Sequence, residues 1–404
     1  MITFSQKQKK PRKIIAIGIG GAGYNVINDI VRNSVPGVET YFIDSNKTTI
    51  KDCLSQIKYC IPRKLVGELG GNAGSRAVNS PEVKALKENL KCFVNSLPPA
   101  EMVFTISGLG GGVGTIIMPL LIPLLKQRRM WVWSLVTLPF FFEGKTKIIN
   151  SLARLRPIYE IANAVMVVAH DRVFKMVDKN LSMKEVFTPA NNLCGELILA
   201  VTRLTCCEDS DHQVKIRFDD IKRKLTDRRA TCFAKGGGSG SDRIKKAIEE
   251  ALKGPLVSVE LLRSAEGIII DICGGKNLSM DEIKKGMEFL QAEVSDKVSM
   301  SFGITVDDGL KDRAQVCLIA LGVDSDNAAN SWGLSLERED SRRGRLDAAG
   351  NKSKDGSQRP RRYRKAEQTM INFKQLSKGR FEKSKATIYE GIDLDIPTFL
   401  RKKR

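Results

Sequence analysis

The sequence predicts an α/β protein in which a parallel-sheet domain is joined by a long central helix to a smaller α+β domain. Short apolar runs alternate with amphipathic segments up to residue 181, which is typical of a parallel sheet covered by helices on both faces. A long helical pattern then runs from Ser182 to Leu204. Beyond Val214, one helical segment precedes three further apolar runs, which indicates a second, smaller sheet.

The composition is that of a globular protein. Hydrophobic residues make up 42% of the 404 positions and charged residues 28%, which excludes a wholly disordered or fibrous chain and allows two or three domains. The 66 basic and 46 acidic residues give a net charge of +20. The nine cysteines show no CxxC spacing and there are only two histidines, so we expect free thiols in a reducing cytosol rather than disulfides or a zinc site.

Each expected strand of the first domain is a short apolar run. These strands cover Ile14–Ile17, Glu39–Asp44, Met102–Ile106, Met130–Thr137 and Ala162–Val168, and a helix over Tyr24–Asn33 follows the first of them. Strands joined by helices favour parallel pairing. In the second domain, a helix is followed by three strands, at Ser241–Lys253 and then at Gly267–Ile272, Ser299–Thr305 and Gln315–Leu321.

One uncharged stretch, Met102–Leu125, is long enough to cross a bilayer. Glycines interrupt its first half and prolines its second, which makes a membrane-spanning helix unfavourable. We therefore expect a buried strand, a glycine turn and a buried helix, with no direct membrane insertion. The basic, polar segment Met1–Lys13 has no apolar block behind it, so no signal peptide is predicted.

The C-terminal region is basic and poor in residues that could be buried. Residues 324–390 hold 16 basic and 10 acidic residues, and Ser341–Pro360 has almost no apolar side chains. Such a segment cannot offset the entropy lost on ordering, so it is predicted to be a disordered linker. Its charge could attract nucleic acid or an anionic membrane. Because no RNA-binding motif or zinc finger accompanies it, we favour a solvated tether with no specific nucleic-acid partner.

The first strand leads into a glycine-rich loop, Gly18–Asn25 (GIGGAGYN). Glycines there allow a tight turn and let backbone N–H groups approach a phosphate at the positive end of the next helix. Alone, the loop matches GxGxxG, and Asp44 ends the next strand where a dinucleotide-binding protein places a ribose-binding carboxylate. A dinucleotide site and a tight turn without a ligand are the two interpretations of this loop by itself.

A second glycine-rich loop, Ser107–Thr115 (SGLGGGVGT), follows the strand Met102–Ile106. Two glycine loops on parallel strands suit a mononucleotide with several phosphates, whereas a dinucleotide-binding domain uses one. The Walker sequence GxxxxGK[ST] is absent, so an ordinary P-loop enzyme is not predicted.

With these two loops in order, the chain resembles the tubulin/FtsZ family, and within it the bacterial FtsZ proteins. The family signature GGGTG[ST]G aligns with Gly110–Ile116, with Val113 and Ile116 as the two departures. Three further family motifs, the ribose-side loop, the start of the central helix and the C-terminal peptide, are matched by Thr137–Lys147, Phe187–Asn192 and Leu394–Lys402.

The resemblance implies five parts along the chain. They are a Rossmann-like nucleotide-binding domain (1–181), a central helix (182–205), a C-terminal GTPase-activating domain (206–323), a disordered basic linker (324–390) and a C-terminal partner-binding peptide (391–404). The peptide would dock on membrane-tethering division proteins. Its expected contact residues are Asp395, Ile396, Pro397, Phe399 and Leu400.

The resemblance also implies a GTP site. The residues expected around the phosphates are Gly20, Gly21, Ala22, Gly23, Tyr24, Asn25, Gly110, Gly111, Gly112, Val113 and Gly114. Val113 replaces a threonine, which removes a hydroxyl donor worth about 0.5–1.5 kcal/mol. Glu143 would accept hydrogen bonds from the ribose, and Lys147 stands where the family has arginine. Phe187 would stack on guanine or occupy a core position, and Asn191 would recognise the edge of the base.

In the family, a loop of pattern NxDxxD reaches the nucleotide of a neighbouring subunit and hydrolyses it. The matching stretch here is Val214–Lys222, where Lys215 and Arg217 replace two polar residues and Asp220 remains as the expected catalytic carboxylate. Such carboxylates orient the attacking water beside Mg²⁺. Two cations in this loop predict reduced turnover. His170, which stands in place of an asparagine, is expected to be a structural turn residue.

The resemblance thus implies a cytoplasmic, GTP-binding cell division protein that stacks head to tail with copies of itself at the division site. It would be a GTPase that uses Mg²⁺ and acts in septation. One alternative is a structural polymer that binds GTP but hydrolyses little or none. A dinucleotide-dependent oxidoreductase is a further alternative, but it leaves the second glycine loop and the C-terminal peptide unexplained.

Overall fold

The computed structural model describes residues 13–67, 80–110, 112–176, 182, 185–206, 214, 216–225, 230–294, 297–324, 388–389 and 392–393. The chain divides into two compact units, Met1–Glu337 and Arg338–Arg404. In the second unit, the described residues form two short antiparallel strands, β11 (Ile388–Tyr389) and β12 (Ile392–Asp393). The expected peptide contacts at 395–400, and all of the predicted linker except residues 324, 388 and 389, lie outside the described residues.

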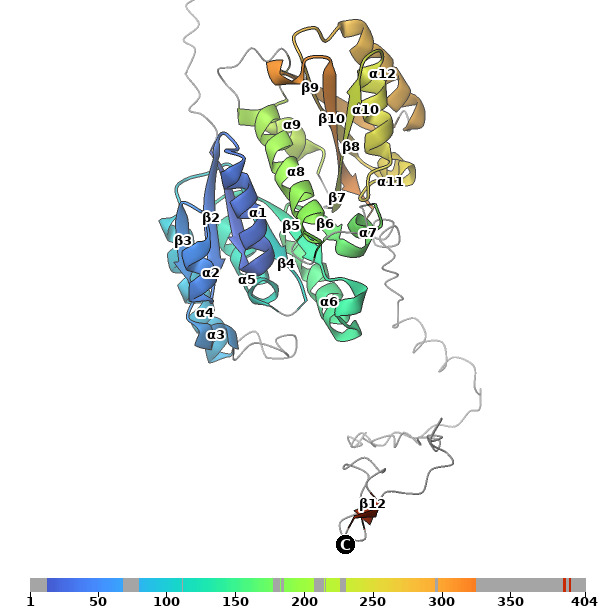
Figure 1. Ribbon diagram of the computed structural model, residues 1–404. Coiled ribbons are helices and arrows are strands. Elements are labelled where there is room, and N and C mark those ends of the chain that lie inside the picture. Colours follow the sequence, from blue (N-terminus) through green and yellow to red (C-terminus); the bar gives the residue numbers. More distant parts are fainter. Residues whose placement is uncertain are drawn as a thin grey trace, which may run out of the picture. The chain divides into compact units, whose positions relative to one another are not determined.

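The first unit is built on a ten-stranded sheet in the order β3-β2-β1-β4-β5-β6-β7-β10-β8-β9 (Figure 1). The strands are β1 (Ile14–Ile19), β2 (Val38–Asp44), β3 (Ile57–Cys60), β4 (Met102–Gly108), β5 (Trp131–Leu138), β6 (Ala164–Ala169), β7 (Ala230–Ser239), β8 (Gly267–Gly274), β9 (Ser299–Val306) and β10 (Arg313–Val323). The strands from β3 to β6 pair in parallel, as predicted. By contrast, β10 runs antiparallel to both β7 and β8.

Helices cover both faces of this sheet (Figure 1). They are α1 (Gly20–Arg32), α2 (Lys47–Asp52), α3 (Arg63–Gly67), α4 (Pro81–Ser96), α5 (Val113–Gln127), α6 (Lys145–Ile161), α7 (His170–Lys175), α8 (Thr188–Cys206), α9 (Phe218–Arg223), α10 (Arg243–Leu252), α11 (Val259–Ser264) and α12 (Met280–Glu293), with 3₁₀ turns η1 (Phe141–Glu143) and η2 (Asp308–Leu310). One apolar core joins α1, α7, α8 and α9 to one face. A second core joins α4, α5, α6, α10, α11 and α12 to the other face.

Two helices begin at other residues than predicted. α1 begins at Gly20 rather than Tyr24, so the first glycine loop forms the first turn of this helix. α8 begins at Thr188 rather than Ser182. Pro189 explains the later start, because it has no N–H to donate to the carbonyl four residues before it and therefore cannot continue a helix through that turn.

The second sheet is continuous with the first, which corrects the prediction of a separate sheet. β7 pairs with β6 through Val165–Ala230 and Met166–Thr231. The sequence does not predict β7, because its glycine-rich end (AKGGGS) is typical of a loop. Those glycines are needed because α10 lies against the strand. A Cβ on Gly236 would come within 2.0 Å of a carbonyl oxygen of that helix.

The uncharged stretch 102–125 forms β4, a glycine turn and most of α5, as predicted. Its apolar side chains are buried in the two cores on either side of the sheet. In the part of the chain that the structure describes, no helix is both long and apolar enough to span a membrane. The seven cysteines whose side chains the structure describes are free thiols.

Candidate functional site

A cleft lies where β1, β2 and β4 end at their carboxyl edge, the position at which ligands bind in open parallel sheets. Its volume is about 390 Å³. The described residues that line it are Ile19, Gly20, Gly21, Ala22, Asp44, Ser45, Asn46, Thr49, Arg63, Gly108, Gly112, Val113 and Gly114. The two predicted glycine loops therefore meet in one space, which we call the glycine cleft.

Both helices that follow these loops begin at the glycine cleft. α1 begins at Gly20, and α5 begins directly after Gly112, its N-cap residue. The first N–H groups of a helix have no partner within the helix, and the helix dipole makes that end positive. Neither helix has an acidic residue in its first turn. Two such ends at one cleft favour a ligand with several negative charges, as phosphates have.

Some of these glycines are required by close packing and others only line the cleft. A Cβ on Gly23 would lie 2.6 Å from the backbone of β1, and a Cβ on Gly114 would lie 1.7 Å from Oγ of Ser107. Side chains at Gly21 and Gly112, by contrast, would meet nothing within 4 Å. The first two glycines therefore hold the helices close to the strands, and the other two leave the cleft open.

Three of the expected phosphate-site residues lie further along α1, outside the lining of the glycine cleft: Gly23, Tyr24 and Asn25. The Tyr24 ring meets the Phe42 ring edge-on, with the centroids 6.0 Å apart. The side chains of Tyr24 and Asn25 are half-buried. Contacts of these side chains with a nucleotide remain a prediction.

The second loop is closed by Thr115, a residue that the sequence does not single out. Its hydroxyl oxygen accepts a hydrogen bond from the N–H of Gly110 at 3.1 Å, and its side chain is buried in the first turn of α5. The N–H of Gly110 is therefore engaged within the loop. Gly108 and residues 112–114 are the described members of this loop that line the glycine cleft, and Gly111 lies outside the described residues.

The expected ribose-side residues lie just after β5, Glu143 in η1 and Lys147 in the first turn of α6. One carboxylate oxygen of Glu143 accepts a hydrogen bond from the N–H of Phe140 at 2.9 Å, and the other lies 3.3 Å from the Lys147 ammonium nitrogen. A carboxylate oxygen can accept more than one hydrogen bond. Glu143 therefore keeps acceptor capacity for a ribose hydroxyl while it caps the loop.

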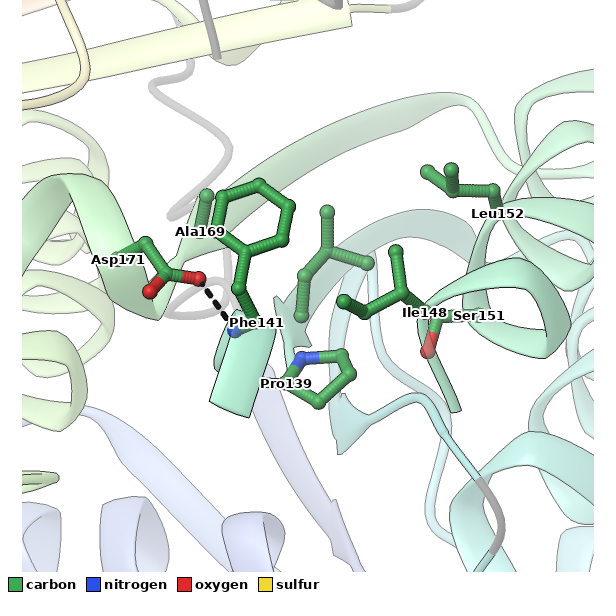
Figure 2. A pocket seen from close by; sticks show the side chains of 8 residues that line it. Pro139, Phe141, Ile148, Ser151, Leu152, Ala169 and Asp171 are labelled. Atoms are coloured by element: carbon green, nitrogen blue, oxygen red, sulfur yellow. Dashed lines mark hydrogen bonds between the residues drawn. The ribbon is translucent and has the colours of Figure 1, made fainter. Parts of the chain in front are cut away.

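Figure 2 shows the side chains that line a small pocket next to this loop. Asp171, in the first turn of α7, accepts a hydrogen bond from the N–H of Phe141 at 2.8 Å. Between this pair and the side chains of Pro139, Ile148 and Ser151 lies a cavity of about 10 Å³. That volume is at the lower limit for a single water molecule. The cavity is too small for a nucleotide base, so these side chains serve to anchor the loop.

Phe187, expected to stack on a base or to pack in the core, lies in a cluster of aromatic rings. Its ring meets Phe140 and His170 edge-on, at centroid distances of 5.7 and 5.2 Å. Phe140 in turn stacks on His170 at 5.0 Å. The Phe187 side chain is half-buried, so part of its surface is accessible. Both expected roles are compatible with this position.

Asn191 lies one turn after Phe187 on α8 and is 5% exposed. Among the described residues, no group forms a hydrogen bond with its side-chain amide, so its donors and acceptor are available. His170 is buried, and Nδ1 of its ring has no hydrogen-bond partner. Burial lowers the pKa of His170 below its ordinary value of 6.5, so the ring is neutral at pH 7. A neutral, packed imidazole agrees with the structural role expected for it.

Several residues of the cleft lining lie outside the predicted set. Asp44, which entered only the dinucleotide interpretation, accepts hydrogen bonds at Oδ1 from the N–H groups of Ser45 and Asn46, at 2.6 and 3.3 Å. Asn46 caps α2 by accepting from the N–H of Thr48 at 3.0 Å. The place of Asp44 at the carboxyl end of a strand was the available signal. No sequence motif marks Arg63, which reaches the cleft from α3.

The expected hydrolysis loop, Val214–Lys222, belongs to a longer stretch that we call the 214–225 segment. This segment lies away from the glycine cleft, between the edge strand β9 and the amino end of β5, where the Phe218 ring meets Trp131 edge-on. Val214 pairs with the edge strand β9, and Arg217 is the exposed N-cap residue of α9. Arg223, which the sequence does not single out, forms an ion pair with Asp220, and this hydrogen bond holds the pKa of that carboxyl below its usual range. Lys215 lies outside the described residues. None of the described residues of the segment lines the glycine cleft.

The helix α8 is fixed to the C-terminal strands by two ion pairs. Arg203 lies 2.6 Å from Asp271 of β8, and Glu196 lies 2.5 Å from Lys235 of β7. Asp271 is completely buried. Removing one partner of a buried ion pair typically costs 3–5 kcal/mol, because the other charge is left without compensation. These pairs therefore set the position of α8 against β7 and β8.

Comparison with known proteins agrees with this geometry. Residues 13–178 match the model of the tubulin/FtsZ family GTPase domain, and residues 230–324 match that of the FtsZ family C-terminal domain. A mutant FtsZ from M. jannaschii is 26% identical, with a TM-score of 0.67 and coverage of 78% of this chain and 92% of that chain. An empty FtsZ dimer from the same organism is also 26% identical, with a TM-score of 0.67 and coverage of 79% and 90%.

A more distant structure has the same fold. It is a GTPγS-bound protofilament of CetZ2 from Haloferax volcanii, 18% identical, with a TM-score of 0.60 and coverage of 82% of this chain and 99% of that chain. At this identity the likeness concerns the fold alone. The expected fold class, a parallel-sheet domain with a smaller C-terminal domain, is confirmed. The expected bacterial origin stays a prediction.

Proposed function

The chain belongs to the tubulin/FtsZ family, and from that premise we propose that it binds GTP and assembles head to tail into filaments. The observation that carries the proposal is the glycine cleft, where the N-termini of α1 and α5 meet. A nucleoside triphosphate supplies the negative charge that two helix N-termini favour. Glycines at the cleft let the phosphate oxygens approach the backbone N–H groups.

Guanine recognition is assigned to the start of α8. The unpartnered amide of Asn191 would hydrogen-bond the edge of the base, and the accessible part of Phe187 would stack on it. Glu143 would accept from the ribose hydroxyls beside Lys147. The CetZ2 structure of the same fold, solved with GTPγS, supports a guanine nucleotide as the ligand.

Hydrolysis in this proposal needs two copies of the chain. Asp220 lies on the 214–225 segment, outside the lining of its own glycine cleft, so it would act on the nucleotide of a neighbouring subunit. The structures of an FtsZ dimer and a CetZ2 protofilament support self-association. Head-to-tail contacts that do not close form filaments. Asp220 would orient the attacking water as a general base does.

Mg²⁺ would accompany the triphosphate. At nucleotide sites this ion is usually held by phosphate oxygens, water and one or two carboxylates. The cleft lining supplies one carboxylate, Asp44, whose Oδ1 already accepts two backbone N–H groups. This donor set fits a metal that is held chiefly by phosphate and water. When bound, the ion would offset the negative charge of the phosphates.

Turnover is proposed to be slow. Arg223 engages Asp220 within the same helix, and Arg217 places a further cation beside it. A carboxylate paired in this way is less available to a water molecule. The same observation favours the second candidate function, a structural polymer that binds GTP and hydrolyses little or none.

We further propose that the protein acts in cell division, in the cytoplasm and at the division site. The similarity of Leu394–Lys402 to the family's C-terminal peptide supports docking on membrane-tethering proteins through Asp395–Leu400. The five-part division of the chain, with boundaries after residues 181, 205, 323 and 390, is part of the same proposal.

Deleting residues 392–404 should leave GTP-dependent pelleting intact and abolish binding to the tether. Loss of pelleting in the truncated protein would contradict this division of labour.

The function is tested with the full chain and three nucleotides. GTP should raise the melting temperature, since a ligand at 100 times its Kd stabilises by about 2.7 kcal/mol, whereas ATP and NAD should not. An equal response to ATP would exclude the guanine assignment, and a response to NAD alone would favour the dinucleotide interpretation. Phosphate release, measured together with pelleted mass, then separates a slow GTPase from a purely structural polymer.

A further inference from the structure

We propose that Arg63 contacts the terminal phosphate of the bound nucleotide, so that the glycine cleft distinguishes a triphosphate from a diphosphate. The inference rests on the proposed GTP binding. Among the described residues that line the cleft, Arg63 carries the only positive charge. The remaining lining consists of backbone, small or uncharged side chains and the carboxylate of Asp44.

The backbone on both sides of Arg63 is held in place by a hydrogen bond and by buried side chains. The N–H of Ile61 donates to the carbonyl of Asp44 at 2.9 Å, which ties the chain after β3 to the end of β2. Ile61 and Val66 are 0% and 7% exposed, so α3 is anchored in the core on both sides of Arg63. Arg63 itself is exposed. Its side chain can therefore reach a ligand without any movement of the backbone.

The guanidinium of Arg63 has no protein partner among the residues that the structure describes, either as an ion pair or as a hydrogen bond. Asp44 shares the cleft lining, but its Oδ1 accepts the N–H groups of Ser45 and Asn46. A cation without a partner, beside two positive helix ends, is placed to bind an anion from solution. Its planar fork of donors matches phosphate oxygens better than an ammonium group does.

The order of the strands indicates which phosphate Arg63 would meet. Glu143 lies after β5, the two helix N-termini lie after β4 and β1, and Arg63 follows β3. The sheet order β3-β2-β1-β4-β5 places these three groups in sequence along one edge. A nucleotide with its ribose beside Glu143 and its inner phosphates at the helix ends extends its last phosphate toward β2 and β3. Among the described residues of the cleft lining, Arg63 is the cation on that side.

The test compares Arg63→Gln, Arg63→Lys and the matched control Lys64→Gln. Lys64 is the neighbouring exposed cation on α3, and it lies outside the cleft lining. Affinities for a non-hydrolysable GTP analogue and for GDP are measured on the full chain, below the concentration at which it assembles. Arg63→Gln should weaken binding of the analogue about 10- to 100-fold and that of GDP less than about threefold. Arg63→Lys should restore part of the loss, and Lys64→Gln should change neither affinity.

The outcomes separate the proposed role of Arg63 from the GTP binding on which it rests. Equal weakening of both nucleotides by Arg63→Gln, or no weakening of either, would overturn the inference while leaving GTP binding intact. A parent protein that binds neither nucleotide would overturn the proposed function, and the inference with it. Melting temperatures without nucleotide identify any variant that is poorly folded. Arg63→Lys then provides the comparison, because it keeps the charge and the length of the side chain.

Discussion

The glycine cleft and the 214–225 segment serve one proposed reaction but are made of different parts of the chain. In the cleft, helix N-termini and glycines would contact the ligand through the backbone, so Val113 in place of threonine leaves the backbone N–H groups available. The segment would act through side chains, and Lys215 and Arg217 change its chemistry. A site made of backbone tolerates substitutions that leave the space open. A site made of carboxylates is lost when those carboxylates are replaced.

The largest expected effect is an increase in GTP turnover when the two cations of the 214–225 segment are replaced by the polar residues of the family pattern. Lys215→Asn with Arg217→Asp places a second carboxylate near Asp220. Positioned acid–base groups contribute roughly 10²- to 10⁴-fold to a rate, so GTP turnover should rise by at least the lower figure if the comparison holds. The measurement is phosphate release per polymerised subunit.

Two controls accompany this double variant. Asp220→Ala should remain inactive in either background, and pelleted mass with a non-hydrolysable analogue shows whether assembly survives the loss of two cations. If the double variant assembles normally but hydrolyses no faster than the parent, the segment is not the missing catalytic element. The purely structural polymer would then be the better function.

The second test breaks the backbone-made site by adding one methyl group. Gly114→Ala places a Cβ 1.7 Å from Oγ of Ser107 and 3.0 Å from the carbonyl oxygen of Gly108, so the Ser107 hydroxyl must rotate and the start of α5 must shift slightly away from β4. Overpacking of this kind typically costs 1–3 kcal/mol, and GTP binding should fall with it. Gly195→Ala, on α8 and outside the cleft lining, is the matched control, since its Cβ would meet nothing within 4 Å. Both are measured by melting temperature and GTP affinity. Similar behaviour of the two variants would argue against a site made of backbone.

A smaller effect is expected where the proposed GTP site depends on a side chain. Asn191→Leu removes the amide that would recognise the base, while a buried side chain of similar size remains. The preference for GTP over ATP should fall by about tenfold, because one hydrogen bond to a base edge provides discrimination of that order. Competition binding with both nucleotides measures it. An unchanged preference would move base recognition away from α8.

The smallest effect concerns His170 and pH. Because burial lowers the pKa of this ring in the folded protein, the unfolded chain binds the proton more readily, and stability falls as the pH drops below about 6.5. The loss is about 1.4 kcal/mol for each unit by which the pKa is lowered. His170→Asn should reduce the difference in unfolding free energy between pH 7 and pH 5, measured by denaturant titration. An identical difference in the parent and the variant would show that other groups set the pH dependence.

The fold could be predicted where buried elements appear in the sequence as local runs of apolar residues. The five parallel strands from β1 to β6, with the exception of β3, are apolar runs that need no knowledge of their neighbours. β7 lacks such a pattern, because its glycines are there for the close approach of α10. The start of α1 was missed for a related reason, since glycines are poor helix formers by themselves and Gly23 is needed for the close approach of α1 to β1.

The candidate site divides in the same way. The glycine loops are local motifs, so the sequence places both of them, and the fold brings them together. Arg63 and Arg223 carry no local signature. The first is defined by the path of the chain after β3, and the second by one helical turn that brings it to Asp220. Such residues are identified only when the backbone is known, because their roles depend on the groups that the fold brings next to their side chains.

The junction between β6 and β7 has a consequence for how the chain is made. β6 ends at Ala169 and β7 begins at Ala230, so at a synthesis rate of 5–20 residues per second the edge of β6 waits about 3 to 12 s for its partner. During that interval an apolar strand (AVMVVA) presents unpaired backbone groups, which is a template for pairing with another chain. Until β7 has been made, the edge of β6 at Val165 and Met166, the two residues that β7 later covers, can pair with a strand of another nascent chain.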